Sequence, residues 1–309
     1  MQTSTTTAPR LSALVAGALG LADRAATSAA ARVLGGAAAD LVDLLLPSVC
    51  AVCAQEPGTL CAPCSTELRA ALLHPYRAED GAAALPLQGS GLSPLPVVAA
   101  AHYGGAVSAA ILAFKDHGRT GLAGVLRPAV SRALNAAPGL VPDLVADAGP
   151  VILVPIPGRA AGFRARGYDP LDELLAGALP VGWSLRSDLL AHRRRLLGPA
   201  STLVRLSGPL GVSGAASHAG STVTSRRRQG HDRFRPTSAL QRWARGPAAP
   251  GSAAATPRVV LVDDVMTTGT TLAAAARALE SVGVRPLAAV VLAAVSPPAD
   301  QEEHGVDTV

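Results

Sequence analysis

Large aromatic side chains and lysine are almost absent from this chain of 309 residues. Aromatic residues make up 3% of it although 49% of its residues are hydrophobic, so the core must be built from Ala, Val and Leu. The length allows one medium-sized α/β domain and a small module, and argues against three or more cores. Lys115 is the one lysine, so arginine carries the net charge of +5, which favours phosphate esters, nucleic acid or acidic lipid as partners without choosing among them.

The sequence also lacks an uninterrupted apolar run of membrane-spanning length. Residues 11–22 form a mostly apolar run that follows Arg10 and precedes small residues, which is the outline of a secretory signal. The apolar character resumes as far as residue 46 with Asp23, Arg24 and Arg32 interspersed, which favours an amphipathic helix instead. We therefore expect a cytoplasmic protein without membrane contact, in which an N-terminal tail and helix (residues 1–46) stop before Pro47.

Cysteine is absent outside one short block, Cys50-x2-Cys53-x7-Cys61-x2-Cys64. Two such pairs are typical of four thiolates around one tetrahedral Zn²⁺, and four filled positions indicate a structural rather than a catalytic ion. A disulfide pair would need an oxidising compartment, and a redox Cys-x-x-Cys explains one pair but not its duplicate. We expect a zinc module over residues 47–73, with these two alternatives left open.

The rest of the chain divides by composition. Residues 74–96 are rich in Gly, Ala, Pro and Ser with little periodicity, which predicts a linker, and residues 97–296 read as an α/β domain before a C-terminal tail (297–309). Within that domain we expect helices over 107–114, 121–136 and 170–179 and a buried strand over 151–156. Residues 198–256 predict a flexible, basic insertion, because the interval 186–245 holds twelve arginines and two acids.

The clearest pattern is a strand, a loop and a helix near the C-terminus. A β-branched run over residues 258–262 is ended by Asp263-Asp264, residues 267–271 follow as Thr-Thr-Gly-Thr-Thr, and a helical period covers 272–282 before a second strand, 286–295. A right-handed crossover places this loop at the carboxyl edge of a parallel sheet. Hydroxyls, loop N–H groups and a helix N-terminus suit a phosphate, whereas paired carboxylates suit sugar hydroxyls or a divalent cation.

Residues 259–271, Val-Val-Leu-Val-Asp-Asp-Val-Met-Thr-Thr-Gly-Thr-Thr, resemble the phosphoribosyl pyrophosphate motif of type I phosphoribosyltransferases. The resemblance implies the parallel sheet with flanking helices of that fold, Mg²⁺ bound with the ligand, and Asp263 and Asp264 at the ribose hydroxyls. It also implies that the loop binds the 5-phosphate through Thr267, Thr268, Gly269, Thr270 and Thr271.

A second segment, residues 154–168, resembles the part of these transferases near pyrophosphate, and the paired prolines and Arg-Gly-aromatic element resemble the ComF family. Arg159, Arg164 and Arg166 are candidate donors to phosphate oxygens, with solvated surface arginines as the alternative. Lys115 lies in a Phe-Lys-x-x-Gly context that also resembles this family, or is a chance survivor of arginine bias.

The order of a four-cysteine module and a phosphoribosyl pyrophosphate motif is similar to that in ComF-like proteins, including the GntX group. The resemblance implies transfer of phosphoribosyl to an acceptor that the sequence does not identify. It also allows a non-catalytic accessory role in competence or DNA processing, with DNA or a DNA-processing protein as partner. The basic interval would then contact that partner, unless it is an insertion shaped by coding bias.

Overall fold

Most elements of the fold lie between residues 49 and 296. The computed structural model describes residues 49–55, 58–88, 93–146, 149–159, 162–163, 166–193, 233–246 and 258–296. The expected N-terminal helix, the C-terminal tail, Arg164 and the larger part of the basic insertion lie outside these ranges. In the part of the chain that is described, no helix has both the length and the apolar character needed to cross a bilayer.

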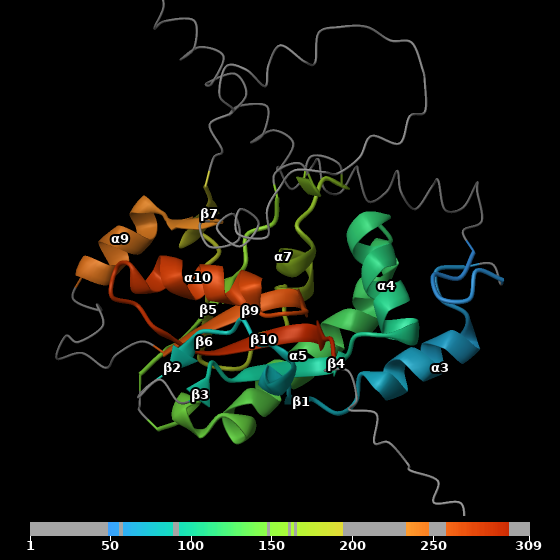
Figure 1. The fold of residues 1–309 in the computed structure, drawn as a ribbon. Coiled ribbons are helices and arrows are strands. Elements are labelled where there is room, and N and C mark those ends of the chain that lie inside the picture. Colours follow the sequence, from blue (N-terminus) through green and yellow to red (C-terminus); the bar gives the residue numbers. More distant parts are fainter. Residues whose placement is uncertain are drawn as a thin grey trace, which may run out of the picture.

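A six-stranded sheet organises the molecule, in the order β1-β4-β10-β9-β5-β6 (Figure 1). Only β1 runs antiparallel to its neighbour; the other pairs in this sheet are parallel. The strands of this sheet are β1 (Tyr76–Arg77), β4 (Val97–His102), β5 (Val151–Pro155), β6 (Trp183–Leu185), β9 (Arg258–Met266) and β10 (Pro286–Ala294). This α/β architecture confirms the expected fold class.

Helices cover both faces of the sheet. On one face, α5 packs against β4, β10 and α7. On the other face, α10 packs against β9 and against the antiparallel pair of β7 (Leu190–His192) and β8 (Phe234–Pro236). The helices are α3 (Ala62–Ala71), α4 (Gly105–Asp116), α5 (Ala123–Leu140), α7 (Pro170–Leu175), α9 (Ser238–Arg245) and α10 (Thr270–Glu280), with short 3₁₀ turns at Glu79–Gly81, Thr120–Leu122 and Pro142–Leu144.

Central strands are apolar along almost their whole length because both faces are covered. In β9, Val259, Val260 and Leu261 are fully buried, and β10 and α10 are rich in buried alanine. Small side chains let the helices approach the sheet closely, so this core packs with Phe114 as its largest fully buried side chain among the described residues. The aliphatic core expected from the composition is what the structure shows.

The strand that carries the acidic pair is longer than expected. Asp263 and Asp264 do not end it: β9 continues to Met266, because β10 pairs with it as far as Ala294 beside Met266. On the other side, pairing with β5 stops at Val262. The two carboxylates therefore lie where β9 has a neighbour on one side only.

The low-periodicity stretch at residues 74–96 packs on the sheet. It supplies β1 and a small hairpin of β2 (Leu87–Gln88) and β3 (Ser93–Pro94), and Ala82, Leu85 and Leu95 are buried in the main core. Alternation is hidden there because these elements are only two residues long. The segment lies against the loop that follows β9, since the Ala84 N–H donates to the carbonyl of Thr268 at 3.0 Å.

The end of the expected flexible insertion is folded. β7 (Leu190–His192) pairs with β8 (Phe234–Pro236), and α9 follows with Thr237 as its N-cap, whose side chain accepts the Leu240 N–H at 3.2 Å. Phe234 and Leu240 are buried, so two apolar anchors hold an otherwise arginine-rich segment. The composition of the segment does not predict this folded part, because Phe234 and Leu240 are few among its polar and charged residues.

Candidate functional site

The connections of the sheet reverse direction between β5 and β9. β5 leads through α7 outward to β6, whereas β9 leads through α10 to β10 on the other side. In open α/β sheets such a reversal leaves a crevice at the carboxyl ends of the strands, where ligands bind. A cavity of about 590 Å³ lies at this point and is lined by residues from both halves.

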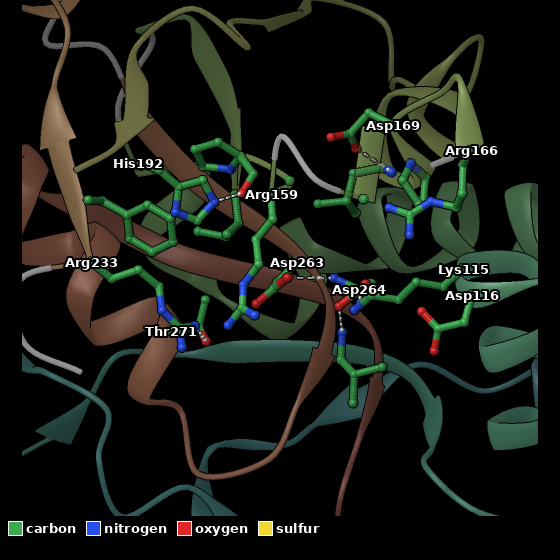
Figure 2. Close-up of a pocket in the computed structure, with 18 of the residues that line it drawn as sticks. Lys115, Asp116, Arg159, Arg166, Asp169, His192, Arg233, Asp263, Asp264 and Thr271 are labelled. Carbon is green, nitrogen blue, oxygen red and sulfur yellow. Dashed lines mark hydrogen bonds and ion pairs between the residues drawn. The ribbon is translucent and has the colours of Figure 1, made fainter. Parts of the chain in front are cut away.

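Figure 2 shows how the charged side chains divide this cavity. Arg233 and Thr271 lie at one end, Lys115, Asp116 and Arg166 lie at the other, and Asp263 and Asp264 lie between them. The lining therefore offers cations at both ends, with Asp116 beside those at one end, and the acidic pair in the middle. That distribution suits a ligand with anionic groups at its two ends and neutral hydroxyls at its centre.

Asp263 is the one buried carboxylate among the described residues, with 8% of its surface exposed. Its Oδ1 accepts the N–H of Asp264 at 2.9 Å, and Asp264 Oδ1 accepts the N–H of Val265 at 2.7 Å. Burial, reinforced by the charge of Asp264, raises the pKa of Asp263 well above its ordinary value. A carboxyl held in this way can accept a hydrogen bond from a ligand hydroxyl or, when protonated, donate one to it.

Lys115 reaches the same centre from the last turn of α4, where its ammonium forms an ion pair with Asp264. Burial by itself would lower the pKa of Lys115, but the carboxylates of Asp264, Asp263 and Asp116 outweigh it and raise the pKa. Tyr168 fixes this region, because its hydroxyl donates to the carbonyl of Phe114 and its ring packs on that side chain. Lys115 therefore stays charged and is part of the site.

The loop after β9 has the geometry of an anion-binding turn. Gly269 has φ of 78° and caps α10, and the hydroxyls of Thr268 and Thr270 are hydrogen-bonded to each other at 2.7 Å. Thr267 and Thr271 line the cavity. Of the expected loop residues, these two face the ligand space and the other three shape the turn, and the N-terminus of α10 opens beside them.

Two of the three expected arginines are described, and both line the cavity. The Nε of Arg166 is buried and has no hydrogen-bond partner among the described residues. A β-carbon at Gly162 would lie 2.7 Å from Nη2 of Arg166, so this glycine is needed for the arginine to pack there. A buried guanidinium nitrogen without a partner is costly unless a ligand anion satisfies it, which fits a phosphate group at this end.

Sequence reasoning missed five polar or aromatic lining residues: Asp116, Asp169, His192, Arg233 and Phe234. Asp169 caps α7, as its Oδ1 accepts the N–H of Leu171 at 2.9 Å. His192 Nε2 lies 2.9 Å from the carbonyl of Pro157, and its ring packs on Phe234 with centroids 5.0 Å apart. The pairing of β7 with β8 across a long insertion brings His192, Arg233 and Phe234 to the cavity, and no local sequence pattern predicts that pairing.

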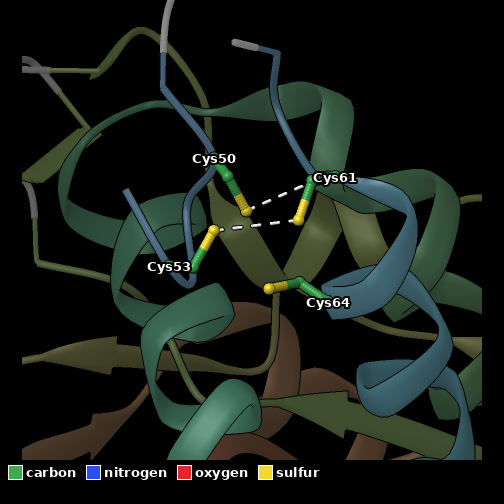
Figure 3. Close-up of side chains that lie close together, drawn as sticks. All are labelled: Cys50, Cys53, Cys61 and Cys64. Carbon is green, nitrogen blue, oxygen red and sulfur yellow. Dashed lines mark hydrogen bonds between the residues drawn. The ribbon is translucent and has the colours of Figure 1, made fainter. Parts of the chain in front are cut away.

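The four cysteine side chains converge on one point (Figure 3). Their sulfur atoms all lie within 4.8 Å of one another, and Cys53 Sγ is 3.7 Å from Cys61 Sγ. A tetrahedral Zn²⁺ with bonds of about 2.3 Å needs sulfur atoms about 3.8 Å apart. The cysteines are thus positioned to hold a metal ion.

Backbone N–H groups support this cluster. Those of Val52 and Cys61 both lie 3.5 Å from Cys50 Sγ. Burial would raise the pKa of Cys50, but N–H donors from Cys61, Cys53 and Val52 lower it to about 6, which favours the thiolate that a metal binds. Apart from the cysteines, this small cluster contains only Val52 and Leu60 as apolar partners.

We predict that Asp263→Asn stabilises the protein in a pH-dependent way. Because the folded-state pKa of Asp263 is raised, its contribution to stability is complete below the ordinary aspartate pKa of about 3.9 and is lost as the pH rises through the folded-state pKa. The variant lacks that loss, so its Tm advantage should grow from pH 4 to pH 8 to roughly 2–4 °C, corresponding to about 1 kcal/mol. Thermal melts without ligand measure this. Asp116→Asn, an exposed carboxylate of the same cavity, is the control, and an equal gain there would refute the burial argument.

The comparison with protein families agrees with this geometry. A family model described as "Phosphoribosyl transferase domain" matches residues 203–309, which contain β8 to β10 with the acidic pair and the threonine-rich loop. No curated protein matches the chain. The matched residues are about a third of the chain, and the remaining walls of the cavity come from β5, α4 and the loop before α7. The C-terminal part of this chain therefore matches a phosphoribosyl transferase domain, and strands and helices that precede the matched residues supply the remaining walls of the cavity.

Proposed function

We propose that this protein binds phosphoribosyl pyrophosphate with Mg²⁺ in the cavity between β5 and β9, as in the ComF family. The observation that carries the proposal is the division of the cavity into two cationic ends around a carboxylate pair. Thr267 and Thr271 at the start of α10 would bind the 5-phosphate, Asp263 and Asp264 the ribose hydroxyls, and Arg159 and Arg166 the pyrophosphate. Thr268, Gly269 and Thr270 stay within the proposed site by their place in the same loop, and Arg164, which lies outside the described residues, stays a candidate from the sequence.

Mg²⁺ would neutralise pyrophosphate oxygens and polarise the leaving group. In the transfer itself, the bond from the anomeric carbon to a pyrophosphate oxygen breaks, and a nitrogen of the acceptor forms the new bond and loses its proton. Arg159 and Arg166 stabilise the negative charge that develops on the departing pyrophosphate. Asp263 and Asp264 hold the ribose in place while positive charge develops at the anomeric carbon.

The direct test is titration calorimetry with phosphoribosyl pyrophosphate and Mg²⁺. The wild type should bind, and Asp263→Asn/Asp264→Asn should weaken binding by roughly 100-fold or more, because the hydrogen bonds of both carboxyl groups with the ribose hydroxyls are lost. Asp143→Asn, at an exposed carboxylate outside the cavity lining, should bind within a few-fold of wild type. No binding by the wild type would overturn the site assignment.

The same preparation distinguishes the two candidate roles. Release of pyrophosphate when nucleobases are added would show transfer. Binding without release would favour the second candidate, an accessory protein that senses the ligand while it contacts DNA or a DNA-processing protein. The observation in favour of that role is a group of exposed arginines on β8 and α9, beside the cavity: Arg235, Arg242 and Arg245.

We also propose that the metal held by Cys50, Cys53, Cys61 and Cys64 is a structural Zn²⁺. Four thiolate ligands leave no open position for a substrate. The module packs on the domain: Arg119 donates to the carbonyl of Val49, and Leu68 of α3 and Leu72, its C-cap, are fully buried in the main core. The ion would therefore stabilise the surface against which α4 packs.

A further inference from the structure

Arg233 is held at the cavity by the pairing of β7 with β8, the strands on either side of the basic insertion in the sequence. Its carbonyl accepts the N–H of Arg193 at 3.0 Å, and the next residue, Phe234, pairs with His192 and is buried. β8 packs against α10, the helix whose N-terminus opens into the cavity. The backbone of Arg233 is thus fixed relative to the threonine-rich loop.

The side chain of Arg233 reaches that loop. Its Nη1 donates to Thr271 Oγ1 at 3.0 Å, and both residues line the cavity together with Thr267. Among the described residues, no carboxylate forms an ion pair with Arg233. A guanidinium has five N–H donors, so this contact leaves donors for an anion bound at the same turn.

The position of Arg233 separates it from Lys115 and Arg166, which lie at the opposite end of the cavity, beyond the acidic pair (Figure 2). Arg159 lies nearer, with its side chain directed toward Asp263. The loop and the start of α10 themselves offer a phosphate only hydroxyls, N–H groups and the helix dipole, all of them uncharged donors. Arg233 adds a full positive charge with a fork that matches phosphate oxygens.

We propose that Arg233 is a direct ligand of the phosphate monoester bound by the loop of residues 267–271, and that it selects a phosphorylated pentose over an unphosphorylated one. This inference rests on the proposed function, since it assigns the 5-phosphate to this loop. It also makes the β7–β8 pair part of the ligand site, because Arg233, which would bind the phosphate, directly precedes β8.

The test compares Arg233→Gln with Arg235→Gln, which removes the same charge two residues along the same segment, at an exposed position. Calorimetry with ribose 5-phosphate, phosphoribosyl pyrophosphate and inorganic pyrophosphate measures binding at the two ends of the cavity separately. Arg233→Gln should weaken ribose 5-phosphate and phosphoribosyl pyrophosphate roughly 10- to 100-fold, the loss of a charge-assisted bond, and leave pyrophosphate unchanged. Arg235→Gln should leave all three within a few-fold.

The other results either contradict the inference or separate it from the proposed function. Equal losses in both variants would mean a general charge effect, and a loss that extends equally to pyrophosphate, with a lower Tm of the free protein, would mean that Arg233 supports the fold of the whole cavity instead of binding the phosphate. Phosphoribosyl pyrophosphate binding that Arg233→Gln leaves intact would overturn the role of Arg233 and leave the proposed function standing. Ribose 5-phosphate binding that depends on Arg233, without any binding of phosphoribosyl pyrophosphate, would do the reverse.

Discussion

Gly269→Ala should lose ligand binding by roughly tenfold or more and destabilise the free protein by about 2–4 kcal/mol. The residue has φ of 78°, a conformation that costs an L-residue about 1–2 kcal/mol. A β-carbon there would also lie 2.8 Å from Leu85 Cδ2 and Cγ and 3.3 Å from Ala82 Cβ, and overpacking of this kind costs about 1–3 kcal/mol. The turn would have to shift, and with it the N–H groups at the start of α10.

The control is Gly283→Ala. That glycine also has a positive φ, of 81°, but a β-carbon there meets nothing within 4 Å. It lies after the far end of α10 and away from the cavity lining. It should show the conformational cost alone, about 1–2 kcal/mol, with unchanged binding. Chemical denaturation and calorimetry on both variants measure the two effects, and equal stability losses would show that the contact with Leu85 does not matter.

Removal of the metal from the cysteine module should have the largest effect on stability. The described part of the cysteine loop, residues 49–55 and 58–61, has Ala51, Val52 and Leu60 as its partly buried apolar residues, which are too few and too small to hold four clustered thiols in place without an ion. Structural zinc contributes folding free energy directly, about 10–16 kcal/mol in small zinc-finger peptides. Cys64→Ser should abolish bound zinc and lower the Tm by roughly 10 °C or more, since losses above about 4 kcal/mol are typical when a metal site is removed.

Elemental analysis measures the metal, and the purified protein should carry close to one zinc ion per chain. Ser65→Ala, at the neighbouring position of α3, is the matched control and should keep both zinc and Tm. Zinc-free protein with an unchanged Tm would contradict a structural role. If α3 stays docked through Leu68 and Leu72, hydrogen exchange after chelation should increase over residues 49–61 first and over the 3₁₀ turn Thr120–Leu122 next, because the side chain of Thr59 lies against Gly121 in that turn.

Local sequence patterns predict the elements whose hydrophobic pattern follows from burial. The β-branched run of β9, the helical period of α10 and the alanine- and valine-rich β10 belong to central, largely buried elements, so their composition follows directly from their surroundings. Short edge elements were not predictable in this way. β1, β2 and β3 have two residues each, too few to show a period of two, and the stretch that contains them read as a linker.

The sequence by itself determined the chemistry: the acidic pair, the threonine-rich turn and the four cysteines each lie within a few consecutive residues, so their spacing already implies convergence. Only the tertiary structure decided which distant residues complete the site. Lys115 comes from α4 and pairs with Asp264, Leu85 supports Gly269, and Arg233 reaches Thr271 across the β7–β8 pairing. These contacts depend on strand order and on the reversal between β5 and β9, which no local pattern encodes, because the free energy that fixes them comes from long-range burial rather than from neighbouring residues.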